Sequence, residues 1–231
     1  MKILIVTATA FESEHISKQL IHPRTENSVV HGTINSHAIS ILATGIGMMN
    51  TAYFLTKTLA QQAYDLVVNI GICGSYRREI PLGSVVHIHD EIFSELGATD
   101  SQGNFIDLEK MGFKLFEKNG KTVFNCIVNV HQPSDFFRID AHVIPGRSLT
   151  INTVNGDDRR IADAQKRYNP DFENMEGGAV AYVCMQESVP YLEFRAVSNY
   201  VEPRNTQNWK IELASQNVQN FILNLLTNSN P

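Results

Sequence analysis

The stretch DLVVNI, residues 65–70, predicts a β-strand whose side chains are buried on both faces of its sheet. Such a sheet needs a layer of helices on each side, and helical segments fall between several of the strand-like runs of this chain. The sequence therefore predicts an α/β fold, a three-layer α/β/α sandwich with a mixed central sheet.

The other elements are predicted from apolar periodicity and turn residues. Besides residues 66–70, strands are expected at residues 2–7, 28–33, 38–44, 84–92, 123–130, 142–151 and 191–198. Helices are expected at residues 47–62, 157–168, 178–187 and 207–226. The last helix carries one apolar stripe at helical spacing, formed by Ile211, Ala214, Val218, Phe221, Ile222 and Leu225. Since a single core can grow to about 250 residues, residues 1–231 are expected to form one domain.

Composition narrows the class of partner. The net charge of −5 and the absence of a Lys/Arg cluster argue against nucleic acid, because phosphate contacts need clustered cations. The opening MKILIVTA contains an apolar run of four residues, too short for a signal peptide or a membrane span. Cys73, Cys126 and Cys184 are odd in number and widely spaced, which fits reduced thiols. A cytoplasmic protein without a membrane partner is expected.

Two glycine-containing segments follow predicted strands. ATGIGMMN, residues 43–50, departs from the dinucleotide fingerprint at its third glycine, where Asn50 stands, so a tight turn is favoured and no cofactor is expected. NIGICGS, residues 69–75, is interpreted as a loop at a strand end. Its two glycines, Gly71 and Gly74, permit either close approach of a ligand to the backbone or a tight turn. A packing role is the default for Cys73.

Several polar residues admit both a structural and a functional interpretation. His87 and His89 share one strand face, but no third ligand motif accompanies them, so no metal is expected. Glu12 follows the first strand and Glu176 precedes a small-residue helix, where each acid either caps free amides or binds a ligand. Together the two acids suggest a hydroxyl-rich ligand. Asn199 is either a turn residue that ends a strand or a ligand-binding amide.

Taken in order, these segments resemble the nucleoside phosphorylase and nucleosidase superfamily, and most closely the futalosine hydrolases of menaquinone biosynthesis. The matching segments span almost the whole chain: the Glu12 turn, ATGIG, NIGICGS, residues 153–156, ENMEGGAVAYVC and FRAVSNYVEPRN. Met-Glu before a small-residue helix, followed by R-A-x-S and then Asp or Asn, is highly specific for the superfamily. The narrower resemblance rests mainly on SNYVEPRN.

The resemblance implies a role for each matching residue. Glu176 would bind the ribose hydroxyls with Met175 beneath the sugar, Glu12 would activate water, and Asn199 would face N7 and the 6-substituent of a purine. The other residues implied are the base-binding Ser198, Ile151, Thr153 and Val154, and the pocket-loop residues Gly71, Ile72, Cys73 and Gly74. Relatives are commonly dimers or larger, so the resemblance also implies a homo-oligomer.

Two departures from the phosphorylases concern the reaction. Those enzymes carry an Arg shortly before the second glycine segment and often a Ser within it, whereas Asn69 and Ile72 stand here. A phosphate anion would be poorly compensated, so water is the expected nucleophile. The Asn199 amide can donate to O6 of hypoxanthine, and adenine-specific relatives use Asp at this place.

The implied reaction is hydrolysis of futalosine to hypoxanthine and dehypoxanthine futalosine. The alternatives are a 6-oxopurine nucleoside phosphorylase, a methylthioadenosine or aminofutalosine nucleosidase, and an inactive nucleoside-binding protein. The benzoate at the 5′ end of futalosine calls for a cation, for which Arg204 and Arg147 are candidates.

Overall fold

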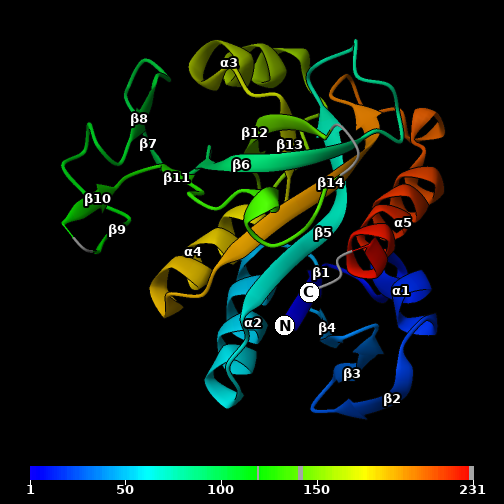
Figure 1. The fold of residues 1–231 in the computed structure, drawn as a ribbon. Helices are drawn as coiled ribbons and strands as arrows, with labels where there is room; N and C mark the ends of the chain where they lie inside the picture. The colour runs from blue at the N-terminus through cyan, green and yellow to red at the C-terminus, as the bar shows by residue number, and fades with distance from the viewer. Residues whose placement is uncertain (119, 140–142, 229–231) are drawn as a thin grey trace.

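The computed structural model describes residues 1–118, 120–139 and 143–228 (Figure 1). The strands are β1 (Lys2–Thr7), β2 (Ile21–Glu26), β3 (Val29–Ile34), β4 (His37–Ala43), β5 (Leu66–Ser75), β6 (Val85–Phe93), β7 (Gly97–Thr99), β8 (Phe105–Asp107), β9 (Phe116–Lys118), β10 (Lys121–Val123), β11 (Cys126–Val128), β12 (Ile144–Thr150), β13 (Phe172–Asn174) and β14 (Tyr191–Tyr200). The α-helices are α1 (Glu14–Lys18), α2 (Met48–Gln61), α3 (Asp158–Tyr168), α4 (Gly177–Glu187) and α5 (Ile211–Asn228), and the short 3₁₀ helices are η1 (Ala10–Ser13), η2 (Pro133–Asp135) and η3 (Thr206–Asn208).

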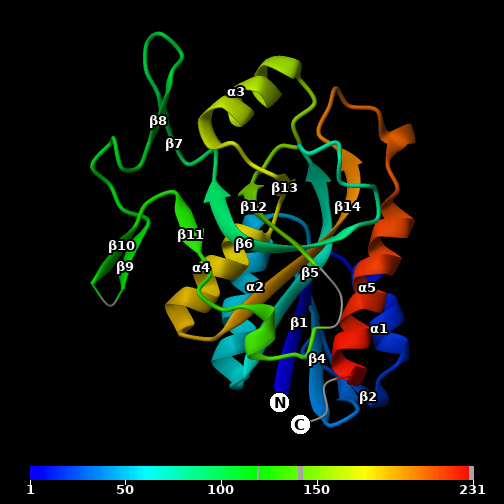
Figure 2. The ribbon, with the colours of Figure 1, turned by 45° about the horizontal axis from the view of Figure 1, so that its top comes forward.

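The central sheet is buried on both faces, as β1 shows most clearly. Ile3 and Ile5 point into a core formed with α1 and α5, whereas Leu4 and Val6 point into a second core formed with α2 and α4. Figures 1 and 2 show these helix pairs on opposite sides of the sheet. The predicted three-layer sandwich with a mixed sheet is therefore confirmed. In the part of the chain that the structure describes, no helix is long and apolar enough to span a bilayer.

The described residues contain one ten-stranded sheet, and five of its strands close into a ring. β5 pairs in parallel with β14 and in antiparallel with β13, while β14 pairs in antiparallel with β6. β12 completes the ring because it runs parallel to both β6 and β13. This closure brings the carboxyl ends of β5 and β14 next to the short strand β13.

Two predicted strand ends are wrong. β5 continues through the glycine-containing segment to Ser75, so residues 71–74 are strand and not a loop. β14 continues to Tyr200 instead of ending at Ser198, because it pairs with the extended β5 along its whole length. A β-bulge interrupts that pairing: Val197 pairs with Cys73 and Asn199 pairs with Gly74, so Ser198 is the extra residue.

The other differences from the predicted elements concern short segments. β2, β13 and α1 were not expected; all six β2 residues are exposed and give no core pattern. The predicted strand at 123–130 is realised as β11, with β10 ending at residue 123, and two small hairpins, β7–β8 and β9–β10, project from the body (Figure 2). β12 begins at Ile144, and residue 142 of the predicted strand lies outside the described residues. α5 begins four residues later than predicted because η3 precedes it.

Candidate active site

A cavity of about 300 Å³ lies at the carboxyl ends of the parallel strands β1, β5 and β14. Its apolar wall includes Phe11, Ile46, Ile72, Ile151, Met175 and Trp209. Its polar groups include Glu12, Glu173, Glu176, Ser198 and Asn199. Among the described residues that line it, none is Lys, Arg or His. The carboxyl ends of strands are the usual place for ligands in α/β sheets, so this cavity is the candidate site.

Glu12 reaches the cavity from η1 and is held by both of its carboxylate oxygens. Oε2 accepts hydrogen bonds from the backbone N–H and the hydroxyl of Thr9, at 2.9 and 3.0 Å. Oε1 accepts from the backbone N–H of Ile72 at 3.3 Å. Burial raises the pKa of Glu12, and this outweighs the lowering caused by Arg195 and by the Thr9 amide. A raised pKa brings a carboxylate closer to the range in which a general base is efficient.

Glu176 stands directly before α4, but its side chain does not cap that helix. The cap is supplied by Asn174, whose Oδ1 accepts from the N–H groups of Glu176 and Gly177 at 2.9 and 2.6 Å. The Glu176 carboxylate instead accepts from the N–H of Gly47 at 3.0 Å and lies 3.4 Å from Nη1 of Arg195. Because Asn174 caps α4, the Glu176 carboxylate is not needed as a cap and can bind a ligand in the cavity.

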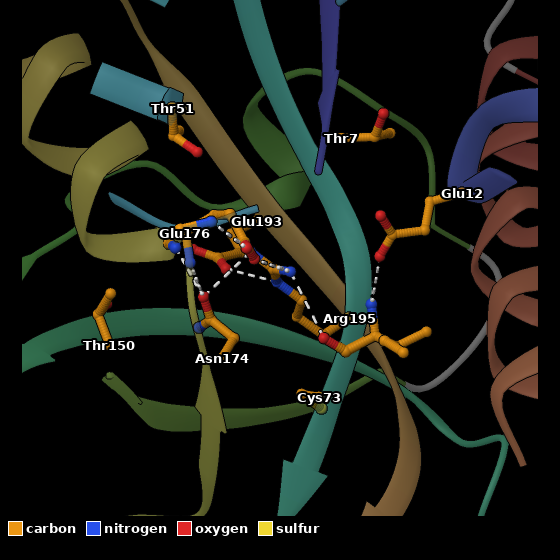
Figure 3. A network of polar contacts seen from close by, with 12 residues as sticks. Thr7, Glu12, Thr51, Cys73, Thr150, Asn174, Glu176, Glu193 and Arg195 are labelled. Carbon is orange, nitrogen blue, oxygen red and sulfur yellow. Dashed lines mark hydrogen bonds and ion pairs between the residues drawn. The ribbon is translucent and has the colours of Figure 1, made fainter. Parts of the chain in front are cut away.

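Arg195 is the buried cation behind the two acids, and Figure 3 shows it between Glu176 and Glu12. Its Nε donates to Glu193 at 2.8 Å, and Nη2 donates to Asn174 Oδ1 at 3.2 Å. Nη1 also donates to the carbonyl of Ile72 at 3.4 Å. Burial lowers the pKa of Arg195, but the neighbouring carboxylates of Glu193 and Glu176 raise it by more. The net effect is a raised pKa, so the guanidinium stays charged. Each of its three nitrogens therefore already donates to a protein acceptor.

Asn199 is directed by the bulge in β14. A bulge re-aims the side chains that follow it and is common beside functional sites. The Ser198 hydroxyl lies 2.8 Å from Asn199 Oδ1, and Asn199 Nδ2 donates to the carbonyl of Tyr200 at 3.1 Å. An amide nitrogen carries two hydrogens, so the second N–H of Asn199 is available to a ligand.

The sequence profile of the phosphorylase superfamily matches residues 2–227 of the chain. The chain belongs to the phosphorylase superfamily. Futalosine hydrolase of Streptomyces coelicolor is 32% identical over 224 residues, which cover 91% of this chain and 89% of that protein. A 5′-methylthioadenosine/S-adenosylhomocysteine nucleosidase of Bacillus cereus is 23% identical over 235 residues, 98% of each chain. The structure of futalosine hydrolase of Helicobacter pylori superposes with a TM-score of 0.79 at 15% identity, covering 98% of this chain and 97% of that one.

These matches confirm the nucleoside phosphorylase-like fold that the resemblance implied. They also assign this superfamily member to the nucleosidases, which are N-glycosyl hydrolases. The matched nucleosidases are named for different substrates, so these matches do not specify which nucleoside this protein hydrolyses.

Most of the predicted site residues line this cavity. They are Glu12, Ile72, Cys73, Gly74, Ile151, Val154, Met175, Glu176, Ser198 and Asn199. Gly71 lies just behind the wall, where an added Cβ would stand 2.8 Å from Glu12 Oε1. Thr153 is exposed and does not line the cavity, although its neighbour Val154 does. Cys73 is buried, and burial raises the pKa of its thiol, in keeping with a packing role.

The two candidate cations for a 5′ carboxylate are placed differently. Arg204 lies over the ring of Trp209, 5.1 Å from its centroid, and Trp209 lines the cavity. Arg147 belongs to a separate cavity, where it lies 3.5 Å from Asp90, so its candidacy is wrong. Arg147 pairs with Asp90 in the register of β12 and β6, and its Nη1 donates to the carbonyl of Tyr168 at 3.5 Å.

Sequence reasoning missed Arg195, Glu193 and Glu173, all of which are buried. A signal existed for the first two: YLEFRAV alternates a charge with an apolar residue, which places Glu193 and Arg195 on one face of a buried strand. Oppositely charged neighbours on a buried strand face must pair, since an isolated buried charge is costly. Glu173 gave no comparable signal, because β13 is only three residues long.

Proposed function

We propose that the protein hydrolyses the N-glycosidic bond of futalosine, releasing hypoxanthine and dehypoxanthine futalosine, a reaction of menaquinone biosynthesis. The observation that carries the proposal is the placement of Glu12, Glu176 and Asn199 around one cavity whose described lining includes no cation. This set supplies a base for water, an acceptor for ribose hydroxyls and a donor for a 6-oxopurine. The relative from Streptomyces coelicolor is named futalosine hydrolase, which is the activity proposed for this protein.

The proposed reaction breaks the bond between C1′ of the sugar and N9 of the purine. The bonding electrons leave with the purine, and the sugar becomes oxocarbenium-like in the transition state. Glu12 takes a proton from the water that attacks C1′, so oxygen joins the sugar and a free hydroxyl remains. Glu176 accepts a hydrogen bond from a ribose hydroxyl, and this charge-assisted bond strengthens as the sugar gains positive charge. The departing purine takes up a proton.

Water is favoured over phosphate by the charges around the cavity. Arg195 is the nearest cation to Glu12 and Glu176, but its N–H groups are bonded to Glu193, Glu176, Asn174 and the Ile72 carbonyl. A phosphate anion would therefore meet carboxylates with no cation among the described lining residues to compensate its charge. Ile72 lines the cavity where phosphorylases often carry a Ser.

The test is the analysis of products formed from futalosine with and without inorganic phosphate. We expect hypoxanthine release at the same rate in both, together with a sugar that carries a free 1-hydroxyl. A requirement for phosphate, or a sugar 1-phosphate as the main product, would instead identify a phosphorylase. Aminofutalosine, inosine and methylthioadenosine belong in the same panel, because preferred release of adenine would contradict the 6-oxopurine assignment.

We further propose that the protein works in the cytoplasm as a homo-oligomer. Its three cysteines are unpaired thiols, which suits a reducing compartment. Ile46, Met49 and Tyr53 form an exposed apolar face at the start of α2, and Ile46 also lines the cavity. A second copy on this face would shield apolar surface and cover the open side of the site.

A further inference from the structure

Three residues form a row across neighbouring strands at the floor of the cavity. In the sheet register Gly74 of β5 pairs with Glu173 of β13 on one side and with Asn199 of β14 on the other. A Cβ built on Gly74 would stand 3.0 Å from Val201 Cγ2, 3.2 Å from Glu173 Cγ and 3.3 Å from Asn199 Nδ2. Both side chains therefore flank the same point on the same face of the sheet. Because Gly74 has no side chain, Glu173 and Asn199 approach each other closely, and all three residues line the cavity. We call this part of the cavity, with a carboxylate beside an amide, the slot.

The carboxylate of Glu173 is fixed from behind. Its Oε2 accepts hydrogen bonds from the hydroxyl of Tyr76 at 2.7 Å and from Nδ2 of Asn155 at 3.1 Å. Glu173 lines the cavity although it is only 3% exposed. Both side-chain bonds go to Oε2, and neither involves Oε1. Burial raises the pKa of Glu173, and this outweighs the lowering by the Tyr76 hydroxyl and by the side chain and the backbone N–H of Asn155.

A 6-oxopurine and a 6-aminopurine present opposite patterns to such a slot. Hypoxanthine offers the acceptor O6 beside the donor N1–H, whereas adenine offers a donor amino group beside the acceptor N1. The row offers an N–H of Asn199 beside the carboxylate of Glu173. Only the 6-oxo pattern is complementary at both positions.

We propose that Glu173 accepts a hydrogen bond from N1–H of a 6-oxopurine whose O6 faces Asn199, and that it thereby excludes adenine. The inference rests on the proposed function for the kind of base that enters the cavity. It makes Glu173 a specificity-determining residue with a role separate from the reaction at C1′. An adenine in the slot would place N1, an acceptor, against a carboxylate that only accepts when ionised.

The decisive variant is Glu173→Gln, because the donors Tyr76 and Asn155 determine which end of the new amide faces the cavity. Tyr76 and Asn155 donate to Oε2, so the glutamine oxygen is expected to face them and its NH₂ group to face the cavity. That NH₂ would oppose N1–H of hypoxanthine donor to donor, but it would satisfy N1 of adenine. A mispaired buried hydrogen bond lowers affinity by about 10- to 100-fold.

The measurement is the calorimetric affinity of the free bases hypoxanthine and adenine for both proteins. We expect the hypoxanthine/adenine affinity ratio to fall at least about tenfold in Glu173→Gln. Tyr76→Phe is the matched control: it removes a bond behind the carboxylate but keeps the acceptor in the slot, so the ratio should stay with the wild type. An unchanged ratio in Glu173→Gln, or an equal loss for both bases in both variants, would overturn the assignment.

This readout separates the inference from the proposed function. Base affinities need no turnover, so the role of Glu173 is tested even if futalosine is not the substrate. A wild-type protein that binds hypoxanthine in preference to adenine but does not hydrolyse futalosine would reject the proposed substrate and leave the role of Glu173 standing.

Discussion

At the scale of single residues, Glu12 both stabilises the local fold through its hydrogen bonds and is the proposed general base. One carboxylate oxygen closes the first turn of η1 through Thr9, and the other faces the backbone of β5 at Ile72. The carboxylate is buried and its pKa is raised, mainly by that burial. It must be ionised to take a proton from water, so activity is expected to fall as pH drops through this raised pKa, above the usual 4.5.

Glu12→Gln keeps the shape of this side chain and one of its two acceptor oxygens but removes the base. We expect kcat to fall about 10²- to 10⁴-fold with little change in hypoxanthine affinity, measured by base release and by calorimetry. Glu14→Gln is the matched control, because Glu14 lies two residues further on, is exposed and pairs with Lys18. A Glu12→Gln enzyme with kcat close to the wild type would mean that another group activates the water.

At the scale of elements, pairing between strands decides where the polar groups point. The bulge at Ser198 places Asn199 opposite Gly74, and the short strand β13 places Glu173 on the other side of the same glycine. Gly71 has a related task, since a Cβ there would stand 2.6 Å from Arg195 Nη1. Both glycines are therefore required by close approach of side chains, and neither has a positive φ.

The exposed face of α2 is the element on which the proposed oligomer depends. Met49 is 86% exposed and Tyr53 is 63% exposed, one helical turn apart. We expect Met49→Glu to lower the molar mass measured by light scattering from that of an oligomer to that of a single chain. A charge at this place would have to be buried in the interface, which is costly without a partner.

The control for this helix is Gln61→Glu, which adds the same charge at the exposed far end of α2. It should leave the molar mass unchanged. A wild-type protein that is a single chain at all concentrations would contradict the proposal directly.

At the scale of the whole molecule, one buried polar cluster ties the ring of strands together. Glu91 of β6 accepts from Nδ2 of Asn174 in β13 at 2.6 Å and from the hydroxyl of Thr150 in β12. A Cβ on Gly177 would meet Glu91 Oε1 at 2.1 Å and Glu193 Oε1 at 2.6 Å, so the two acids lie close together. Burial, and then Glu193, raise the pKa of Glu91 well above its usual value. We therefore expect the folded protein to hold a proton here at pH values where the unfolded chain has lost it.

This retained proton sets the sign of a pH effect on stability. When the folded state binds more protons than the unfolded state, the free energy of unfolding falls as pH rises, by about 1.4 kcal/mol per pH unit for one proton. The contribution is complete below the pKa of an unfolded glutamate and is lost as pH rises towards the folded-state pKa. In Glu91→Gln the group cannot titrate, so the variant should gain stability relative to the wild type as pH rises above the usual glutamate pKa of 4.5.

Urea unfolding at several pH values measures this difference. The exposed Glu109→Gln variant serves as the control and should follow the wild type at every pH. Parallel curves for Glu91→Gln and the wild type would show that Glu91 is ionised in the folded protein.

The sequence by itself determined the layers, the long elements and most of the candidate site. Runs such as LVVNI and the stripe of α5 record burial directly in local periodicity, and the Met-Glu and R-A-x-S segments carry the resemblance that places Glu12, Met175, Glu176 and Asn199. The ends of β5 and β14, the bulge at Ser198 and the existence of β13 were decided by the tertiary structure alone. These features depend on which strands pair, and pairing joins residues about a hundred positions apart that no local pattern connects. For the same reason the row of Glu173, Gly74 and Asn199 is invisible along the chain and exists only once the ring of strands has closed.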